Sequence, residues 1–300
     1  MMNKDKDTYC GFVAIIGKSN VGKSTLLNKL IGEKISITAN RPQTTRNKIL
    51  GVKTIDNKQI IYIDTPGVSL NNNSKLNKLM NKTAKSSFQD ADLIIFMIEG
   101  LKWNLEDEAV LQSIMKLKNN PVVFLLLNKL DLVADEKLLL PQVQNLMNQY
   151  NFTEVFPVSA RKNINLDKLE TALVSFLPKS VHYFLDDNIT DKDLNFRIAE
   201  IIREKLIKNL SQELPYTTHV QIDNIEEKPM IHHISATIWV EKTGQKKILI
   251  GEGGNKLKTI GTQARLDLEK LLNHKVFLTL FVQVKSNWTN DSDNLKTLNI

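Results

Sequence analysis

The sequence has very little cysteine and no long apolar segment, and both absences narrow the possible function classes. Its one cysteine, Cys10, cannot form an internal disulfide or a cysteine-based metal site, which fits a reducing cytosol. The longest apolar run, VVFLLL at 122–127, is much shorter than the roughly 20 residues that span a bilayer, so we expect a buried strand there. The first residues lack the charged-then-apolar pattern of a secretory signal, so we expect a cytoplasmic protein.

Positive charge exceeds negative charge, and its distribution is uneven. The chain has 40 Lys and Arg against 33 Asp and Glu, a net charge of +7. Residues 183–300 are balanced at 16 against 16, yet within them 242–265 holds six basic residues and one acid, Glu252. This local patch is either a solvated face or a surface that binds a phosphate backbone.

The first 180 residues alternate short apolar runs with longer amphipathic ones. The runs FVAII, IIYID, LIIFMI, VVFLLLN and EVFPVSA are separated by helical patterns such as 75–89, 105–118 and 138–149. This alternation predicts an α/β domain with a mostly parallel sheet, whose ligand loops lie at the carboxyl ends of the strands.

The remaining chain predicts a second, smaller domain. Residues 181–194 are polar and aperiodic, as in a linker. From 195 to 286 the patterns give the order helix, strand, strand, helix, helix, strand, which is a small α+β module. Residues 287–300 lack apolar periodicity and are expected to be a mobile tail.

The stretch GKSNVGKST at 17–25 lies between an apolar strand and an amphipathic helix. Its glycines let successive N–H groups face an anion, and the start of the helix adds a positive end. In this pattern Lys23 reaches the β- and γ-phosphates and Ser24 binds Mg²⁺. The sequence therefore predicts a P-loop nucleotide site.

Two later segments identify the nucleotide. Asp64 ends a strand and begins DTPG, where a carboxylate can hold the metal through water and Gly67 can approach the γ-phosphate. In NKLD, Asp131 can accept hydrogen bonds from the N1–H and amine of guanine, a pair that adenine lacks. Asn128 braces this loop, Lys129 covers the base, and a backbone N–H at Ser159 or Ala160 could meet the guanine oxygen. These features predict GTP.

These motifs resemble those of translation-factor-like GTPases. The segment RPQTTRNKI resembles their first switch, which implies that Thr45 binds Mg²⁺ when the γ-phosphate is present, or Thr44 if the register differs by one. Val68 replaces the glutamine that orients water in Ras-like proteins, which implies slow intrinsic turnover. Asn20 resembles an asparagine that helps to hold a monovalent cation, so K⁺ is a predicted second cofactor.

The candidate nucleotide site therefore contains three kinds of assignment. Predicted catalytic residues are Asn20, Lys23, Thr45 and Gly67, and predicted metal ligands are Ser24, Thr45 and Asp64. The residues predicted to bind GTP are Gly17, Lys18, Ser19, Asn20, Val21, Gly22, Lys23, Ser24, Thr25, Asp64, Thr65, Pro66, Gly67, Asn128, Lys129, Asp131, Ser159 and Ala160.

The second domain contains a G-x-x-G turn between two helical segments. Such a turn lets a nucleic-acid backbone lie against bare main chain, as in KH domains. The residues predicted to bind RNA are Lys246, Lys247, Gly251, Glu252, Gly253, Gly254, Lys256, Lys258 and Arg265.

As a whole, residues 8–288 resemble the Era family of GTPases, which carry a C-terminal KH domain of type II. The resemblance rests on the GTPase motifs, RPQTTR, AEIIREKL…ELPY, LKTIG and the closing VKSNW. It implies a monomeric cytoplasmic factor that binds 16S rRNA, assists small (30S) ribosomal subunit assembly and also associates peripherally with the inner face of the membrane. The chain departs from the family in two places: the Asn-rich stretch after the second switch, and Glu252, an acid in a phosphate-facing loop. The second departure predicts weakened RNA affinity.

Two other function classes remain open from the sequence alone. One is a metabolic enzyme that uses a nucleotide, although the five histidines lack metal-ligand spacing and His232 and His233 are expected to face solvent. The other is a peripheral membrane-associated GTPase in cell-cycle signalling, against which the G-x-x-G turn argues.

Overall fold

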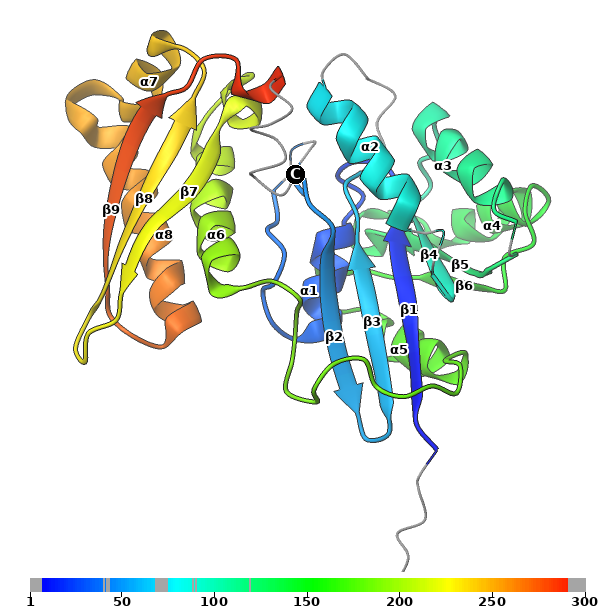
Figure 1. The fold of residues 1–300 in the computed structure, drawn as a ribbon. Helices are drawn as coiled ribbons and strands as arrows, with labels where there is room; N and C mark the ends of the chain where they lie inside the picture. Colours follow the sequence, from blue (N-terminus) through cyan, green and yellow to red (C-terminus); the bar gives the residue numbers. More distant parts are fainter. Residues whose placement is uncertain are drawn as a thin grey trace, which may run out of the picture. The chain divides into compact units, whose positions relative to one another are not determined.

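The computed structural model describes residues 7–39, 41, 44–67, 75–87, 89, 91–118 and 120–290 (Figure 1). The chain divides into two compact units: one contains most of the chain up to Asp191, and the other contains the chain from Lys192. The division falls within the predicted linker at 181–194. Val68, the predicted replacement for a catalytic glutamine, lies outside the described residues.

The first unit is built on a six-stranded sheet with the strand order β2-β3-β1-β4-β5-β6. Neighbouring strands are parallel except β2 and β3, which are antiparallel, so the prediction of a mostly parallel sheet is confirmed. The strands are β1 (Tyr9–Ile16), β2 (Ile49–Ile55), β3 (Lys58–Asp64), β4 (Leu93–Glu99), β5 (Val122–Asn128) and β6 (Glu154–Pro157).

Five α-helices accompany this sheet within the described residues. They are α1 (Lys23–Ile31), α2 (Lys75–Ser87), α3 (Leu105–Met115), α4 (Leu139–Met147) and α5 (Leu166–Ser175). Ala84 of α2, Leu111 of α3 and Leu146 of α4 share one buried cluster with sheet residues such as Ile94 and Phe96. Burial of this apolar surface holds the carboxyl ends of the strands, and hence the motif-bearing loops, in fixed positions.

The predicted linker packs along the first unit instead of leaving it. The buried side chain of Gln59 accepts hydrogen bonds from the N–H groups of Tyr183 (2.9 Å) and Phe184 (3.0 Å). Further along, Val52 of β2 donates its N–H to the carbonyl of Ile189 at 2.9 Å. Strand β2 is the edge of the sheet, so this segment satisfies backbone groups that would otherwise be unpaired.

The second unit has the predicted element order. It contains α6 (Leu194–Asn209), β7 (His219–Glu226), β8 (His232–Val240), α7 (Thr243–Ile250), α8 (Asn255–Leu272) and β9 (Val276–Val284). The sheet order is β7-β8-β9, with β7 antiparallel and β9 parallel to β8. Residues from α6, α8 and one face of the sheet form its buried cluster, among them Ile202, Ala264 and Ile238.

The expected tail boundary at 287 needs correction. Trp288 is fully buried, donates its ring N–H to the carbonyl of Thr217 at 3.0 Å and packs beside His219. Burial of this large, mostly apolar ring is favourable, and it fixes the chain at Trp288 although residues 286 and 287 before it are exposed and the segment has no apolar periodicity. Residues 291–300 of the predicted tail lie outside the described residues.

Candidate functional site

The phosphate loop connects β1 to α1, as the motif predicts. Gly22 has φ +111°, and a Cβ at this position would lie 2.4 Å from the side-chain nitrogen of Asn128. Only glycine combines that backbone conformation with so close an approach. Asn20, at φ +62°, is the exposed tip of the loop, and α1 begins at Lys23 with its N-terminal N–H groups at the loop.

The side chain of Lys23 folds back into the loop. Its ammonium group donates to the carbonyls of Gly17 (3.0 Å) and Lys18 (2.8 Å). Burial lowers the pKa of Lys23 to about 8, while the carboxylates of Asp64 and Glu106 act in the opposite direction. A buried cation enclosed by backbone groups is suited to neutralising phosphate oxygens.

Three oxygen-bearing side chains meet beside this lysine. The hydroxyl of Ser24 lies 2.7 Å from a carboxylate oxygen of Asp64 and 2.8 Å from the hydroxyl of Thr45. The other Asp64 oxygen is buried and has no hydrogen-bond partner among the described residues, and burial raises the pKa of this carboxyl group although the Ser24 hydrogen bond and the charge of Lys23 lower it. Hard oxygen donors with one unsatisfied carboxylate oxygen fit a Mg²⁺ ion.

This geometry distinguishes the two threonines of the first switch that the sequence leaves as candidate metal ligands. Thr45 is buried within the oxygen cluster. The hydroxyl of Thr44 instead donates to the carbonyl of Arg41 at 2.7 Å. The structure also adds Ser36, whose hydroxyl donates to Asp64 at 2.8 Å and which no sequence motif indicated.

The DTPG segment closes the phosphate side of the site. Thr65 is buried and donates its hydroxyl to the carbonyl of Ile15 at 3.0 Å, which ties the segment to β1. Gly67 lies directly against the phosphate loop, because a Cβ there would be 2.8 Å from the backbone nitrogen of Ser19. Pro66 is buried between these two residues.

The NKLD loop lies at the end of β5, opposite the end of β4. The side-chain amide of Asn128 donates to the carbonyl of Val21 (2.7 Å) and accepts from the N–H of Ala160 (2.9 Å), so it connects the NKLD loop to the phosphate loop and to the loop after β6. Ser159 donates its hydroxyl to the exposed carboxylate of Asp131 at 2.5 Å. Asp131, the residue predicted to recognise guanine, therefore has one carboxylate oxygen fixed by Ser159.

The two backbone N–H groups that were predicted to contact guanine both bond to the protein. The N–H of Ser159 bonds to the carbonyl of Ile164 at 3.2 Å, and the N–H of Ala160 bonds to Asn128. A short bridge between Ser159 and Ile164 closes this loop on itself. Both N–H groups therefore have a protein acceptor in this structure, and their contact with a guanine oxygen stays a prediction.

Two ion pairs that involve lysines of the nucleotide motifs were missed by sequence reasoning. Lys18 and Asp107, both buried, pair at 2.6 Å, so the ammonium group of Lys18 is held by α3. Lys129 pairs with Glu99 at 2.6 Å. The Asn104–Asp107 spacing signals a capping box at the start of α3, which the structure shows, but it does not reveal the lysine partner.

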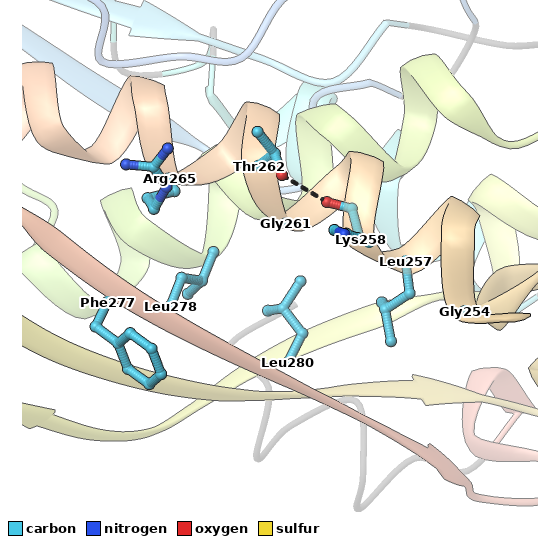
Figure 2. A pocket seen from close by; sticks show the side chains of 9 residues that line it. All are labelled: Gly254, Leu257, Lys258, Gly261, Thr262, Arg265, Phe277, Leu278 and Leu280. Carbon is cyan, nitrogen blue, oxygen red and sulfur yellow. Dashed lines mark hydrogen bonds between the residues drawn. The ribbon is translucent and has the colours of Figure 1, made fainter.

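The second unit has a groove of about 490 Å³ between α8 and β9 (Figure 2). Three of the residues predicted to bind RNA line it: Gly254, Lys258 and Arg265. The other lining residues are Leu257, Gly261, Thr262, Phe277, Leu278 and Leu280. Lys246 and Lys247 lie on α7, while Glu252, Gly253 and Lys256 lie in or beside the turn at the end of the groove.

The G-x-x-G turn has the backbone that the motif requires. Gly251 and Gly254 have φ +75° and +79°, and a Cβ on Gly251 would come within 2.7 Å of the Cβ of Lys256. Nothing lies within 4 Å of the corresponding position on Gly254, so the groove mouth is open there. Arg265 is half-buried and pairs with Glu269 at 2.9 Å, whereas Glu252 is exposed.

The strand-start histidines are not fully solvent-facing. His232 and His233 are half-buried, and their rings pack against His274 (4.4 Å between centroids) and Phe277 (5.3 Å). Across the described part of the chain, no group of three or more His, Cys, Asp or Glu side chains could hold a metal ion. No helix there combines the length and apolar character needed to cross a membrane.

The fold and the site define a P-loop GTPase domain followed by a KH domain. The family model for 50S ribosome-binding GTPases matches residues 12–129, and the KH domain model matches residues 213–289. The chain is 45% identical over 295 residues to GTPase Era of Vibrio vulnificus (strain YJ016), covering 98% of this chain and 92% of that protein. The chain belongs to the Era family, and it is a GTPase.

Another relative and two solved structures also match this chain over nearly its full length. GTPase Era of Yersinia enterocolitica is 45% identical, covering 99% of this chain and 98% of that protein. A crystal structure of Era with MgGDPNP and nucleotides 1506–1542 of 16S ribosomal RNA has a TM-score of 0.91 at 38% identity, covering 97% and 98% of the two chains. A single-residue variant of Aquifex aeolicus Era bound to GDP·AlF4⁻ has a TM-score of 0.92 at 37% identity, covering 97% and 99%.

Proposed function

We propose that this protein is a GTP-driven switch that binds 16S rRNA through its KH domain and assists assembly of the small (30S) ribosomal subunit. One observation carries the proposal: the solved Era structure that matches 97% of this chain holds a magnesium-bound nucleotide and a 16S rRNA segment together. The two candidate sites described above are the places where this chain would bind the same two ligands. The proposed setting is the cytoplasm, as a monomer, with peripheral membrane association as a further prediction.

We propose a separate role for each group of residues in the nucleotide site. Asp131 selects guanine, and Asn128 fixes the distance between the base loop and the phosphate loop. Lys23 and the N–H groups of the loop bind the β- and γ-phosphates. Gly67 lies close enough to Ser19 for its N–H to approach the γ-phosphate.

Mg²⁺ is the proposed metal cofactor. Ser24 and Thr45 would contribute hydroxyl oxygens, and Asp64 would hold the ion directly or through water. When bound, the ion neutralises charge on the phosphate oxygens. Thr45 belongs to the switch segment, so its engagement would distinguish GTP from GDP.

Hydrolysis is proposed to be slow and assisted by K⁺. The sequence has Val68 after the DTPG motif, and a valine side chain can neither orient nor polarise water. Asn20 is exposed at the tip of the phosphate loop, where its side-chain oxygen could help to hold a cation beside the phosphates. Such a cation would neutralise the charge that an arginine finger neutralises in other GTPases.

We therefore expect steady-state GTP hydrolysis to be faster in potassium than in sodium at equal ionic strength. Asn20→Ala should remove this difference, because the alanine offers no oxygen to the larger ion. Phosphate release at saturating GTP and Mg²⁺ measures both rates. Equal rates in the two salts for the unchanged protein would reject the cation proposal and leave the GTPase assignment intact.

The assembly role predicts a specific defect when the protein is depleted from its own cells. Sucrose-gradient profiles should show more free small subunits and fewer complete ribosomes, with immature 16S rRNA in the small-subunit fractions. Maturation of the large-subunit rRNA serves as the internal control and should be unchanged. An unaltered profile after full depletion would contradict the assembly role.

A further inference from the structure

The segment that connects β4 to α3 carries none of the nucleotide motifs, yet it forms ion pairs with lysines of two of them. The segment begins at Glu99, the last residue of β4, and ends at Asp107 in the first turn of α3. Glu99 pairs with Lys129 of the NKLD loop at 2.6 Å, and Asp107 pairs with Lys18 of the phosphate loop at 2.6 Å. The segment therefore contacts both nucleotide loops.

The pair between Lys18 and Asp107 is the more deeply buried of the two. Its side chains are 9% and 0% exposed, against 29% and 18% for Lys129 and Glu99. A buried ion pair contributes little more to stability than an apolar pair of the same shape, although removal of one partner leaves a buried charge unpaired. Stability alone therefore does not account for an ion pair at this place.

The carboxylate of Asp107 is attached to a rigid part of the first unit. The oxygen that pairs with Lys18 also accepts from the N–H of Asn104 at 3.1 Å, and the N–H of Asp107 donates to the Asn104 side chain at 3.2 Å. Helix α3 is in turn fixed by Val110 and Leu111, which belong to the buried cluster of the sheet. The carboxylate is thus a fixed point to which the phosphate loop is attached.

The main chain of Lys18 extends this attachment to Lys23. The carbonyl of Lys18 accepts a hydrogen bond from the ammonium group of Lys23 at 2.8 Å, beside the carbonyl of Gly17 at 3.0 Å. The side chain of Lys18 is buried and held by α3, so its backbone carbonyl has little freedom to turn. Two consecutive contacts therefore lead from α3 to the Lys23 ammonium group.

We propose that Asp107 is a positioning residue for GTP hydrolysis: its ion pair with Lys18 fixes the Lys18 carbonyl, and this carbonyl places the Lys23 ammonium group against the phosphates. This inference rests on the proposed contact of Lys23 with the β- and γ-phosphates. Charge on the phosphate oxygens must be neutralised in the transition state, and a displaced ammonium group neutralises it less well.

The test measures steady-state GTP hydrolysis by the full-length protein with Mg²⁺. Asp107→Asn keeps the shape of the side chain and an oxygen that accepts from the N–H of Asn104, but it removes the charge. It should lower kcat roughly 10- to 100-fold, as expected for a small displacement of a catalytic group, and change KM less than kcat. Glu108→Gln is the matched control, because Glu108 is a carboxylate of the same helical turn that bonds to Gln112 of its own helix. Its kcat should be unchanged.

Two further variants distinguish positioning from folding. In the double variant Lys18→Met with Asp107→Asn no buried charge is left unpaired, so its thermal unfolding temperature should lie near that of the unchanged protein. Its kcat should remain as low as that of Asp107→Asn, because the attachment to α3 is lost. Lys18→Arg should be faster than Lys18→Met, since a guanidinium can also reach the second Asp107 oxygen, which is buried and has no hydrogen-bond partner among the described residues.

The outcomes separate this inference from the proposed roles in the nucleotide site. An unchanged kcat in Asp107→Asn, or a rise in KM alone, would overturn it. Recovery of both the unfolding temperature and kcat in the double variant would show that the pair serves folding only, and this comparison decides the matter if Asp107→Asn alone does not fold. Lys18→Arg as slow as Lys18→Met would also contradict it. Normal hydrolysis by Lys23→Ala would instead refute the proposed role of Lys23 itself.

Discussion

Asp131→Asn is expected to lower the affinity for GTP roughly 100- to 1000-fold and to create measurable affinity for xanthosine triphosphate. Guanine presents N1–H and an amine, and a carboxylate accepts from both. Asparagine retains one acceptor, and its NH₂ group opposes the guanine amine. Xanthine carries an oxygen at that position, so the same NH₂ group can donate to it.

The hydrogen bond between Ser159 and Asp131 allows this substitution to be made without unfolding the loop. The hydroxyl of Ser159 holds one oxygen of Asp131, and it can donate equally to the amide oxygen of an asparagine, so the loop should remain folded. Asp135→Asn is the matched control, because Asp135 is an exposed carboxylate of the same loop whose side chain accepts from the N–H of Lys137 at 3.0 Å. Titration with fluorescent GTP and competing nucleotides measures the change, and unchanged GTP affinity would remove Asp131 from the site.

Gly254→Asp should abolish binding of single-stranded rRNA while GTP hydrolysis continues. Nothing lies within 4 Å of the Cβ position of Gly254, so a side chain there would project into the mouth of the groove. The carboxylate would add repulsion toward phosphates. Filter binding of an rRNA fragment across a salt series measures the loss, and wild-type binding would show that the G-x-x-G turn does not hold the RNA backbone.

Three further variants distinguish the effects of side-chain bulk, position and charge on RNA binding in that experiment. Gly254→Asn adds bulk without charge and tolerates the left-handed backbone, so it should weaken binding less than the aspartate. Gly244→Asp places the same charge at the start of α7, outside the groove, and should bind normally. Glu252→Lys should tighten binding and steepen its salt dependence by about one phosphate contact. If Glu252→Lys alone has no effect, the Glu252 side chain points away from the RNA.

Much of the fold follows from the sequence because strand and helix patterns depend on local periodicity. Strand β2 is absent from the predicted set, since Gly51 and Lys53 interrupt its alternation and it is stabilised by pairing with β3 and with Ile189. The burial of Trp288 likewise depends on Thr217 and His219, which lie far away in the sequence. Such contacts are tertiary and leave no local pattern.

The candidate nucleotide site was predictable as a set of motifs, but its pairings were not. Spacing located Lys23, Asp64 and Asn128 because each motif has a fixed relation to a strand end. The Lys18–Asp107 pair joins residues 89 positions apart, and the placing of Thr45 rather than Thr44 beside Asp64 depends on the path of an irregular segment. Neither has a spacing that sequence reasoning could use.

The most direct test of the central claim is ultraviolet crosslinking of the protein to RNA in its own cells, with the crosslinked sites identified by sequencing. We expect crosslinks on 16S rRNA concentrated near its 3′ end, with loss of these crosslinks in Gly254→Asp and their retention in Gly244→Asp. Crosslinks spread evenly over cellular RNA, or a Gly254→Asp pattern equal to that of the unchanged protein, would contradict the claim that this GTPase docks on 16S rRNA through its KH domain.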